Sequence, residues 1–238
     1  MVRIKLWDLP TRVFHWSLLA LVVTSFASGW TGGNFMEWHG RAGVAIIGLL
    51  TFRLTWGFIG STHARFSRFV RGPAGIASYL RGRWSGVGHN PLGALSVLGM
   101  LVLLLCQAMG GLFANDDIAF NGPYFLAISK DMSDWITGWH RRGGWLILGL
   151  VGLHLGAILF YIQVRKETLI KPMLTGTKEV PETLVGESAR DGGLAAFCVA
   201  LGLSLVAAWA ASGALLPAPP APPVQAAPAA KPAANTGW

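Results

Sequence analysis

The sequence predicts an all-α membrane protein with five membrane-spanning helices and an extended C-terminal tail. Of its 238 residues, 53% are hydrophobic and only 13% are charged, whereas a soluble domain carries about 25% charged residues. Several stretches without Asp, Glu, Lys or Arg are long enough to cross about 30 Å of hydrocarbon at about 1.5 Å per residue. The segment from Pro217 to Trp238 has seven prolines among many alanines, a composition that cannot form a packed core and favours an extended tether or linker.

Five stretches without charged residues define the predicted spans. They run over residues 13–36, 42–52, 85–115, 143–164 and 192–230. The second is short, but it becomes a full span from His39 to Gly60 when Arg53 is allowed inside it. The fifth, taken as Gly193 to Leu216, is rich in alanine and glycine and has no histidine. We therefore expect it to pack outside the functional bundle through small residues.

The first apolar stretch could also be a signal peptide, because Met1 to Gly29 has basic residues followed by the run Leu18 to Ala27. However, Trp7, Asp8 and Pro10 interrupt the basic region, and a His-Trp pair opens the apolar run. The sequence therefore favours a retained helix.

The basic residues lie mostly on one side of the predicted spans. The positive-inside rule therefore puts the N-terminus in the cytoplasm and the C-terminus in the periplasm. The formal net charge is +8, but the basic residues are distributed according to the predicted membrane topology. This distribution argues against a nucleic-acid partner. The cytoplasmic group is Arg3, Lys5, Arg12, Arg65, Arg68, Arg71, Arg81, Arg83, Arg165, Lys166, Lys171, Lys178 and Arg190, and the periplasmic group is Arg41, Lys130, Arg141, Arg142 and Lys231.

Two loops carry further signals. Pro73 to Trp84 is amphipathic and suits a helix lying on the inner leaflet, although an irregular loop is equally compatible with it. The predicted periplasmic loop from Asn115 to Gly138 is richer in acidic residues and suits a basic periplasmic partner, or is simply a solvated loop. Its acidic residues are Asp116, Asp117, Asp131 and Asp134.

Four of the six histidines lie in or at the mouths of the first, second and fourth spans: His15, His39, His140 and His154. A single histidine on an apolar helix is more often a hydrogen-bonded core residue than a ligand. Ionisable groups inside a membrane are costly and usually functional, however. Four of them together indicate a site.

The spacing of these histidines pairs them by depth. His140 and His154 are fourteen residues apart on one span, so they lie about 40° apart on one face and about 21 Å apart along the axis. The topology pairs His39 with His140 on the periplasmic side, and His15 with His154 on the cytoplasmic side. Two haem groups, each held by imidazoles from two helices, fit this arrangement.

Other metal sites fit the pattern less well. Zinc and di-iron sites need ligands clustered at one depth, with Cys or carboxylates among them, and the predicted spans contain no Asp or Glu. The same absence argues against a proton-coupled transporter. Cys106 and Cys198 form no C-x-x-C-H motif, so covalent haem attachment is not indicated. A haem iron with two axial histidines has no open position, which favours electron transfer over oxygen activation.

Arg53 is a charged residue in the interior of the second predicted span. It follows His39 by fourteen residues and so lies on a similar face, nearer the cytoplasm. We expect a propionate of the cytoplasmic haem as its partner, with snorkelling to the lipid headgroups as the alternative. His63 and His89, which flank the second cytoplasmic loop, are interpreted as structural or propionate-contacting residues rather than axial ligands.

Several motifs carry a family resemblance over about Val2 to Lys178. They are LWDLPTRVFHWSL (6–18), WHGRAG (38–43), FRLTWGFIGSTHARF (52–66), GHNPLGA (88–94), GLH (152–154) and LTGTK (174–178). The sequence resembles the bacterial cytochrome b561 family, especially the branch with the b-type subunits of membrane nickel-iron hydrogenases. The resemblance implies four core helices, two non-covalent haem b groups, and axial ligands at His15, His39, His140 and His154. It does not cover the fifth span and the tail, which leaves the partner open.

The sequence thus predicts a four-helix haem-binding transmembrane bundle in residues 1–178, a linker and fifth transmembrane helix in 179–216, and a disordered Ala/Pro-rich tail in 217–238. The predicted function is electron transfer through two bis-His haem b groups between a periplasmic redox partner and the quinone pool, in the bacterial inner membrane. A c-type cytochrome is the favoured partner because the tail lies next to an acidic loop, and a hydrogenase is the alternative.

The sequence alone does not determine four properties. They are the direction of electron flow, the quinone-binding residues, whether the chain itself has quinone oxidoreductase activity, and whether it forms a homodimer. A haem-free membrane anchor and a transporter that uses the bundle as a pathway are the alternatives from other functional classes.

Overall fold

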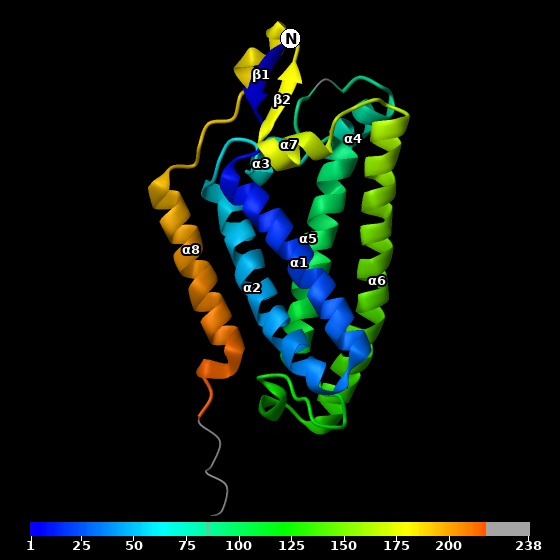
Figure 1. Cartoon of the computed structure of the whole chain (residues 1–238), viewed down its shortest axis with the longest axis vertical. Helices are drawn as coiled ribbons and strands as arrows, with labels where there is room; N and C mark the ends of the chain where they lie inside the picture. Colours follow the sequence, from blue (N-terminus) through cyan, green and yellow to red (C-terminus); the bar gives the residue numbers. More distant parts are fainter. Residues whose placement is uncertain (85, 218–238) are drawn as a thin grey trace, which may run out of the picture.

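Five long helices dominate the computed structural model, which describes residues 1–84 and 86–217 (Figure 1). Each is long and apolar enough to cross a membrane by its length and composition, so the predicted all-α fold with five spans is confirmed. Residues 218–238, which hold nearly all of the predicted tail, lie outside the described residues. The helices are α1 (Leu9–Thr31), α2 (Met36–Ile59), α5 (Pro91–Gly111), α6 (Lys130–Gln163) and α8 (Leu194–Trp209), which continues into the π-helix η4 (Ala210–Ala214).

The connections between these helices gather at two ends of the bundle (Figure 1). One end lies opposite the N-terminus and is named the far end. It holds the 3-10 helix η1 (Gly33–Phe35), the loop 112–129 with the 3-10 helix η2 (Phe125–Ala127), and the end of α8. The opposite end holds the N-terminus and the predicted cytoplasmic basic residues, and is named the basic end. Its elements are β1 (Val2–Lys5), α3 (Phe66–Phe69), α4 (Pro73–Leu80), α7 (Ile170–Thr175), β2 (Thr177–Val180) and the 3-10 helix η3 (Glu182–Glu187).

A two-stranded antiparallel sheet ties the N-terminus to the chain that follows α6. Val2 pairs with Val180 and Lys5 with Thr177, and the Lys5 ammonium lies 2.6 Å from the Asp191 carboxylate. The sequence analysis did not predict this sheet, because each strand has only four residues and the pairing joins distant parts of the chain. The sheet fixes the position of the residues that enter α1.

Local capping signals set where the helices begin. Asp8 Oδ1 accepts a hydrogen bond from Thr11 N (3.1 Å), and Asn90 Oδ1 accepts one from Gly93 N (2.7 Å); in both cases a proline follows within two residues. Side-chain oxygens at this position satisfy free N–H groups of the first turn. The third span therefore begins at Pro91 rather than Ser85.

The fourth span is longer than predicted. Ser129 caps it through a hydrogen bond from Met132 N (3.3 Å), and the helix begins at Lys130. Residues 130–138, predicted as part of the periplasmic loop, are therefore helical, because charged residues in a first turn are compatible with a capped helix. In the loop between α2 and α5, which is predicted to be cytoplasmic, residues 73–80 form α4, so the helical alternative is correct there.

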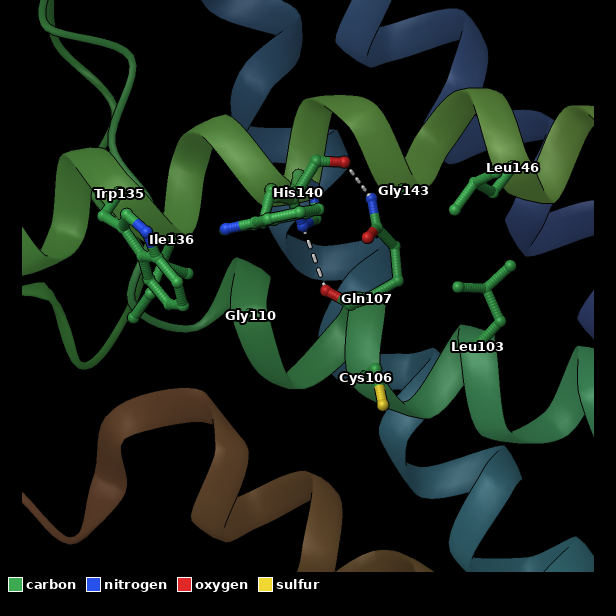
Figure 2. Close-up of a pocket in the computed structure, with 10 residues that line it drawn as sticks. Leu103, Cys106, Gln107, Gly110, Trp135, Ile136, His140, Gly143 and Leu146 are labelled. Atoms are coloured by element: carbon green, nitrogen blue, oxygen red, sulfur yellow. Dashed lines mark hydrogen bonds between the residues drawn. The ribbon is translucent and has the colours of Figure 1, made fainter.

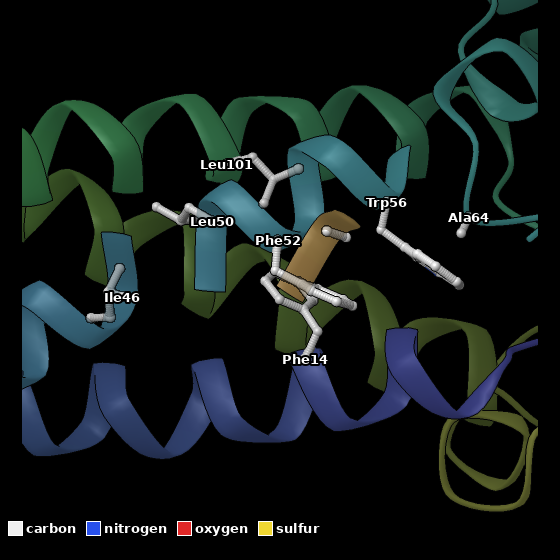
Figure 3. Packing of buried hydrophobic residues seen from close by; sticks show 8 residues of the cluster. Phe14, Ile46, Leu50, Phe52, Trp56, Ala64 and Leu101 are labelled. Carbon is white, nitrogen blue, oxygen red and sulfur yellow. The ribbon is translucent and has the colours of Figure 1, made fainter. Parts of the chain in front are cut away.

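Helix α2 lies at the centre of the packing. Half of its most apolar window is buried inside the protein, compared with 6% for α6. Figure 3 shows its residues Ile46, Leu50, Phe52 and Trp56 in contact with neighbouring helices. The outward apolar side chains of the other helices remain exposed, as expected for surfaces that face lipid rather than water.

The fifth span packs on α2 from outside the four-helix bundle (Figure 1). Ser204 Oγ donates to the Gly48 carbonyl oxygen at 2.8 Å, and Ala200 and Ala211 are buried. A β-carbon at Gly48 would lie only 3.1 Å from Ala208 Cβ and 3.2 Å from Ser204 O. The predicted packing through small residues is confirmed.

Replacing Gly48 with valine should loosen α8 from α2. The new side chain meets backbone and a β-carbon, so overpacking of about 1–3 kcal/mol is expected, with a lower thermal unfolding midpoint of the purified protein in detergent. Gly202→Val is the matched control, because nothing lies within 4 Å of a β-carbon at that glycine of α8. Equal midpoints for the two variants would show that Gly48 does not limit the approach of α8.

Candidate functional site

The structure brings His39 of α2 and His140 of α6 together near the far end. Their ring centroids are 5.8 Å apart and their planes are inclined by 80°. A metal ion bound about 2 Å from one nitrogen of each imidazole would hold the centroids roughly 6 Å apart. The separation of this pair therefore suits two ligands of one iron.

Backbone carbonyls define the protonation of both rings. His39 Nδ1 lies 2.8 Å from Ser25 O, and His140 Nδ1 lies 3.0 Å from Gln107 O, as Figure 2 shows. Because a carbonyl oxygen only accepts, each Nδ1 carries the proton and each Nε2 keeps its lone pair. Such a hydrogen bond to the second nitrogen orients metal-binding histidines and raises their basicity. Both rings are thus prepared to bind iron through Nε2.

Glycines allow these two rings to lie where they do. A β-carbon at Gly29 would approach His39 Nδ1 to 2.9 Å, and one at Gly111 would approach His140 Cε1 to 3.1 Å. Any larger residue at Gly29 would push the ring away from its carbonyl partner. The placement of His39 therefore depends on a small residue of α1.

A groove of about 400 Å³ lies beside His140, between α5 and α6 (Figure 2). The Gln107 amide closes one side of it and donates from Nε2 to the His140 carbonyl oxygen. The groove is lined by Leu103, Cys106, Gln107, Gly110, Trp135, Ile136, Trp139, His140, Gly143 and Leu146.

The second predicted pair lies toward the basic end. His15 is on the second turn of α1, and His154 follows His140 by fourteen residues on α6. The two rings are close enough to interact electrostatically. His15 Nδ1 is buried and has no hydrogen-bond partner among the described residues. Unlike the far-end pair, this pair is not oriented by backbone carbonyls at both Nδ1 atoms.

Arg53 is buried near this second pair, with 3% of its surface exposed. Its Nη1 donates to Ala64 O at 3.1 Å, and the guanidinium carbon lies 4.9 Å from the centre of the Phe66 ring. The side chain is thus directed into the loop that follows α2. Its closest electrostatic partner of opposite charge is Asp8.

His89 and His63 lie in the same region. The His89 ring is 4.7 Å from Trp7 and 4.8 Å from Phe69, centre to centre, and its Nδ1 is buried without a partner among the described residues. Burial lowers the pKa of His89 to about 3, and Arg53 and His63 act in the same direction. His89 is therefore neutral at physiological pH.

The sequence analysis missed the residues that support these groups. Asp8 is 2% exposed, and its Oδ2 accepts a hydrogen bond from Trp56 Nε1 at 2.8 Å. The Asp-x-Pro pattern could have identified Asp8 as a helix cap, but not its link to Trp56. The carbonyl partners of His39 and His140 carry no sequence signal, because any residue has a carbonyl.

Comparison with known proteins shows the family to which the chain belongs. The model of the prokaryotic cytochrome b561 family matches residues 6–176. The chain belongs to the prokaryotic cytochrome b561 family. It is a membrane b-type cytochrome of electron transport, related to hydrogenase cytochrome b subunits, and its family implies haem b as cofactor. The match covers α1, α2, α5 and α6 and ends before α8.

Relatives of this cytochrome carry hydrogenase names. The "Probable Ni/Fe-hydrogenase B-type cytochrome subunit" of Rhizobium leguminosarum bv. viciae is 26% identical over 216 residues, which cover 74% of this chain and 88% of the relative. The "Probable Ni/Fe-hydrogenase 1 B-type cytochrome subunit" of Escherichia coli (strain K12) is 23% identical over 210 residues, with 71% and 88% covered. No solved structure matches this cytochrome significantly.

Proposed function

We propose that this cytochrome carries electrons across the membrane through two haem b groups, one held by His39 and His140 and the other by His15 and His154. The observation that carries the proposal is the 5.8 Å separation of the His39 and His140 ring centroids, with both Nδ1 atoms hydrogen-bonded to backbone carbonyl oxygens. Haem b supplies a one-electron ferric/ferrous couple, and two axial imidazoles leave its iron no open position for oxygen.

The protein's part in this function is to fix and insulate the two sites. Helix α6 holds its two histidines about 21 Å apart along one rigid axis. The carbonyls of Ser25 and Gln107 orient the far-end imidazoles before any cofactor binds. The apolar helices exclude water from the space between the sites, which keeps the local dielectric low.

Arg53 is proposed to bind a haem propionate at the basic end. Its guanidinium is buried, and a buried cation needs an anion near it. The Asp8 carboxylate is close, but its two oxygens already accept from Thr11 N and Trp56 Nε1. The Arg53 guanidinium has N–H donors besides the one that bonds Ala64 O, and a propionate carboxylate would accept from them.

The proposed orientation places the basic end in the cytoplasm of a bacterium and the far end in the periplasm. The positive-inside rule supports it, because the basic residues of the loops concentrate at the basic end. The far-end loop is acidic and ordered: Asp116 Oδ1 accepts hydrogen bonds from the backbone N–H groups of Ile118, Ala119 and Phe120, each at 2.9 Å. A c-type cytochrome with a basic face is the proposed periplasmic partner, and membrane quinone is the proposed second one.

A hydrogenase is the second candidate partner, because the relatives of this chain bear the names of hydrogenase cytochrome subunits. The two candidates can be separated by electron transfer to the purified, oxidised cytochrome. Reduction by a hydrogenase under hydrogen, without reduction by a ferrous c-type cytochrome, would favour the hydrogenase.

Haem content of single histidine variants tests the ligand assignment. Pyridine haemochrome analysis should give two haem b per chain in the wild type and about one in His15→Ala, His39→Ala, His140→Ala and His154→Ala. The two variants of a pair should lose the same spectral component, because removing either ligand opens one iron. Trp145→Ala, at an exposed position of α6 between the two histidines, should keep both haems. A folded wild type without a Soret band would overturn the proposal and favour the anchor or transporter.

A methyl group at Gly29 should disturb one haem selectively. Gly29→Ala places a β-carbon against His39 Nδ1 and breaks the bond to Ser25 O. Loss of such a supporting bond weakens metal binding about 10–100-fold. Electron paramagnetic resonance of the ferric protein should show one altered low-spin signal, which is the signal lost in His39→Ala. Gly99→Ala, where a β-carbon meets open space, is the control; an unchanged spectrum in both variants would contradict the role of Gly29.

A further inference from the structure

Buried polar atoms without partners gather at the basic end. Buried polar groups normally have a hydrogen-bond partner, and leaving them without one costs stability. A cluster of them therefore indicates that a polar ligand completes the site. Among the described residues, those at this end are Thr11 Oγ1, Arg12 Nε, His15 Nδ1, Ser61 Oγ, Arg65 Nε and His89 Nδ1.

The charge at this end favours an anionic ligand. Arg53 is buried, and the buried Nε of Arg65 has no hydrogen-bond partner in the part of the chain that the structure describes. Asp8 is the acidic group that interacts with Arg53, and each of its oxygens already accepts one hydrogen bond. An arginine has five N–H donors, and Arg53 uses one of them for Ala64 O. Donors are thus in excess over acceptors.

His89 is held rigidly within this cluster. The next residue, Asn90, caps α5 and also donates from Nδ2 to the Tyr161 hydroxyl at 2.8 Å. The His89 ring lies against Trp7 and Phe69, which are 8% and 4% exposed. Phe69 also lies 6.0 Å from the Arg53 guanidinium carbon. His89 and Arg53 therefore border the same aromatic side chain.

The surroundings of His89 connect it to the second histidine pair. His89 is within electrostatic range of Arg53, His63, His15 and His154. Its neutral ring has one N–H to donate. A carboxylate that reached both Arg53 and His89 would consequently lie beside the group held by His15 and His154.

We propose that His89 donates a hydrogen bond from Nδ1 to a propionate of the haem held by His15 and His154, beside Arg53. Arg53 and His89, together with residues 61–69 of the basic end, would then hold the propionate of this haem. This inference rests on the proposed function. A lipid phosphate would offer the same oxyanion chemistry, but the buried position behind Trp7 and Phe69 favours a group that belongs to the bundle interior.

Spectroelectrochemical titration of His89→Leu tests the assignment. Loss of a neutral donor leaves the propionate charge less compensated, which stabilises ferric iron and lowers the midpoint potential of one haem. The expected change is about tenfold in the ferric/ferrous equilibrium, or about 59 mV for a one-electron couple. Resonance Raman spectra should show a shifted propionate bending band for the same haem, which is the one lost in His15→Ala.

Two variants control for structural damage. His89→Gln keeps an N–H donor and should restore the potential and the Raman band toward wild type. Tyr79→Phe removes a hydroxyl that contacts Tyr161 at the same end and should leave both haems unchanged.

The outcomes separate this inference from the proposed function. A wild type without haem would overturn both. Two haems with unchanged potentials and Raman bands in His89→Leu would overturn the inference alone. Unchanged potentials together with loss of bound phospholipid, measured as phosphorus per haem, would assign the oxyanion site to a lipid headgroup instead.

Discussion

The structure depends on one constraint: helix α6 presents two histidines at two depths in an apolar environment. An imidazole inside a membrane is tolerated only when its N–H and its lone pair are both used. His140 and His154 are about 21 Å apart along this axis, so the partners must come from different elements. The fourth residue of α2 supplies His39 at one depth, and the second turn of α1 supplies His15 at the other.

The two ends meet the requirement differently. At the far end, the carbonyls of Ser25 and Gln107 take the Nδ1 protons, so the orientation of both rings is set by the backbones of α1 and α5. At the basic end, His15 Nδ1 has no such partner within residues 1–84 and 86–217, and some buried polar atoms of the surrounding loops also lack a hydrogen-bond partner there. The described residues thus satisfy the Nδ1 atoms of the far-end pair, whereas at the basic end they leave the Nδ1 atoms of His15 and His89 without a partner. In the proposed function, the two haem groups would therefore have different polar environments.

Helix α8, which follows the residues matched by the family, packs away from the histidine pairs. Helix α8 covers the outer side of α2, where Ser204 donates to the Gly48 carbonyl oxygen, while the ring centroids of His39 and His140 lie 5.8 Å apart between α2 and α6. The short sheet at the basic end fixes the entry to α1 in a similar way. It holds Trp7 against His89 and places Asp8 where it caps α1 and accepts from Trp56.

The sequence by itself determined the five spans, the side on which the basic residues lie, and the pairing of histidines by depth, because hydropathy and helical periodicity are local properties that the bilayer enforces. It placed the starts of α5 and α6 less well, since polar capping residues extend or shorten a helix beyond its apolar stretch. Only the tertiary structure decided the sheet between residues 2–5 and 177–180, the burial of Arg53 against residues 64–69, and the carbonyl partners of His39 and His140. These features join residues that are distant along the chain. In addition, every residue type has a backbone carbonyl, so the sequence does not show which carbonyl accepts a hydrogen bond from a histidine.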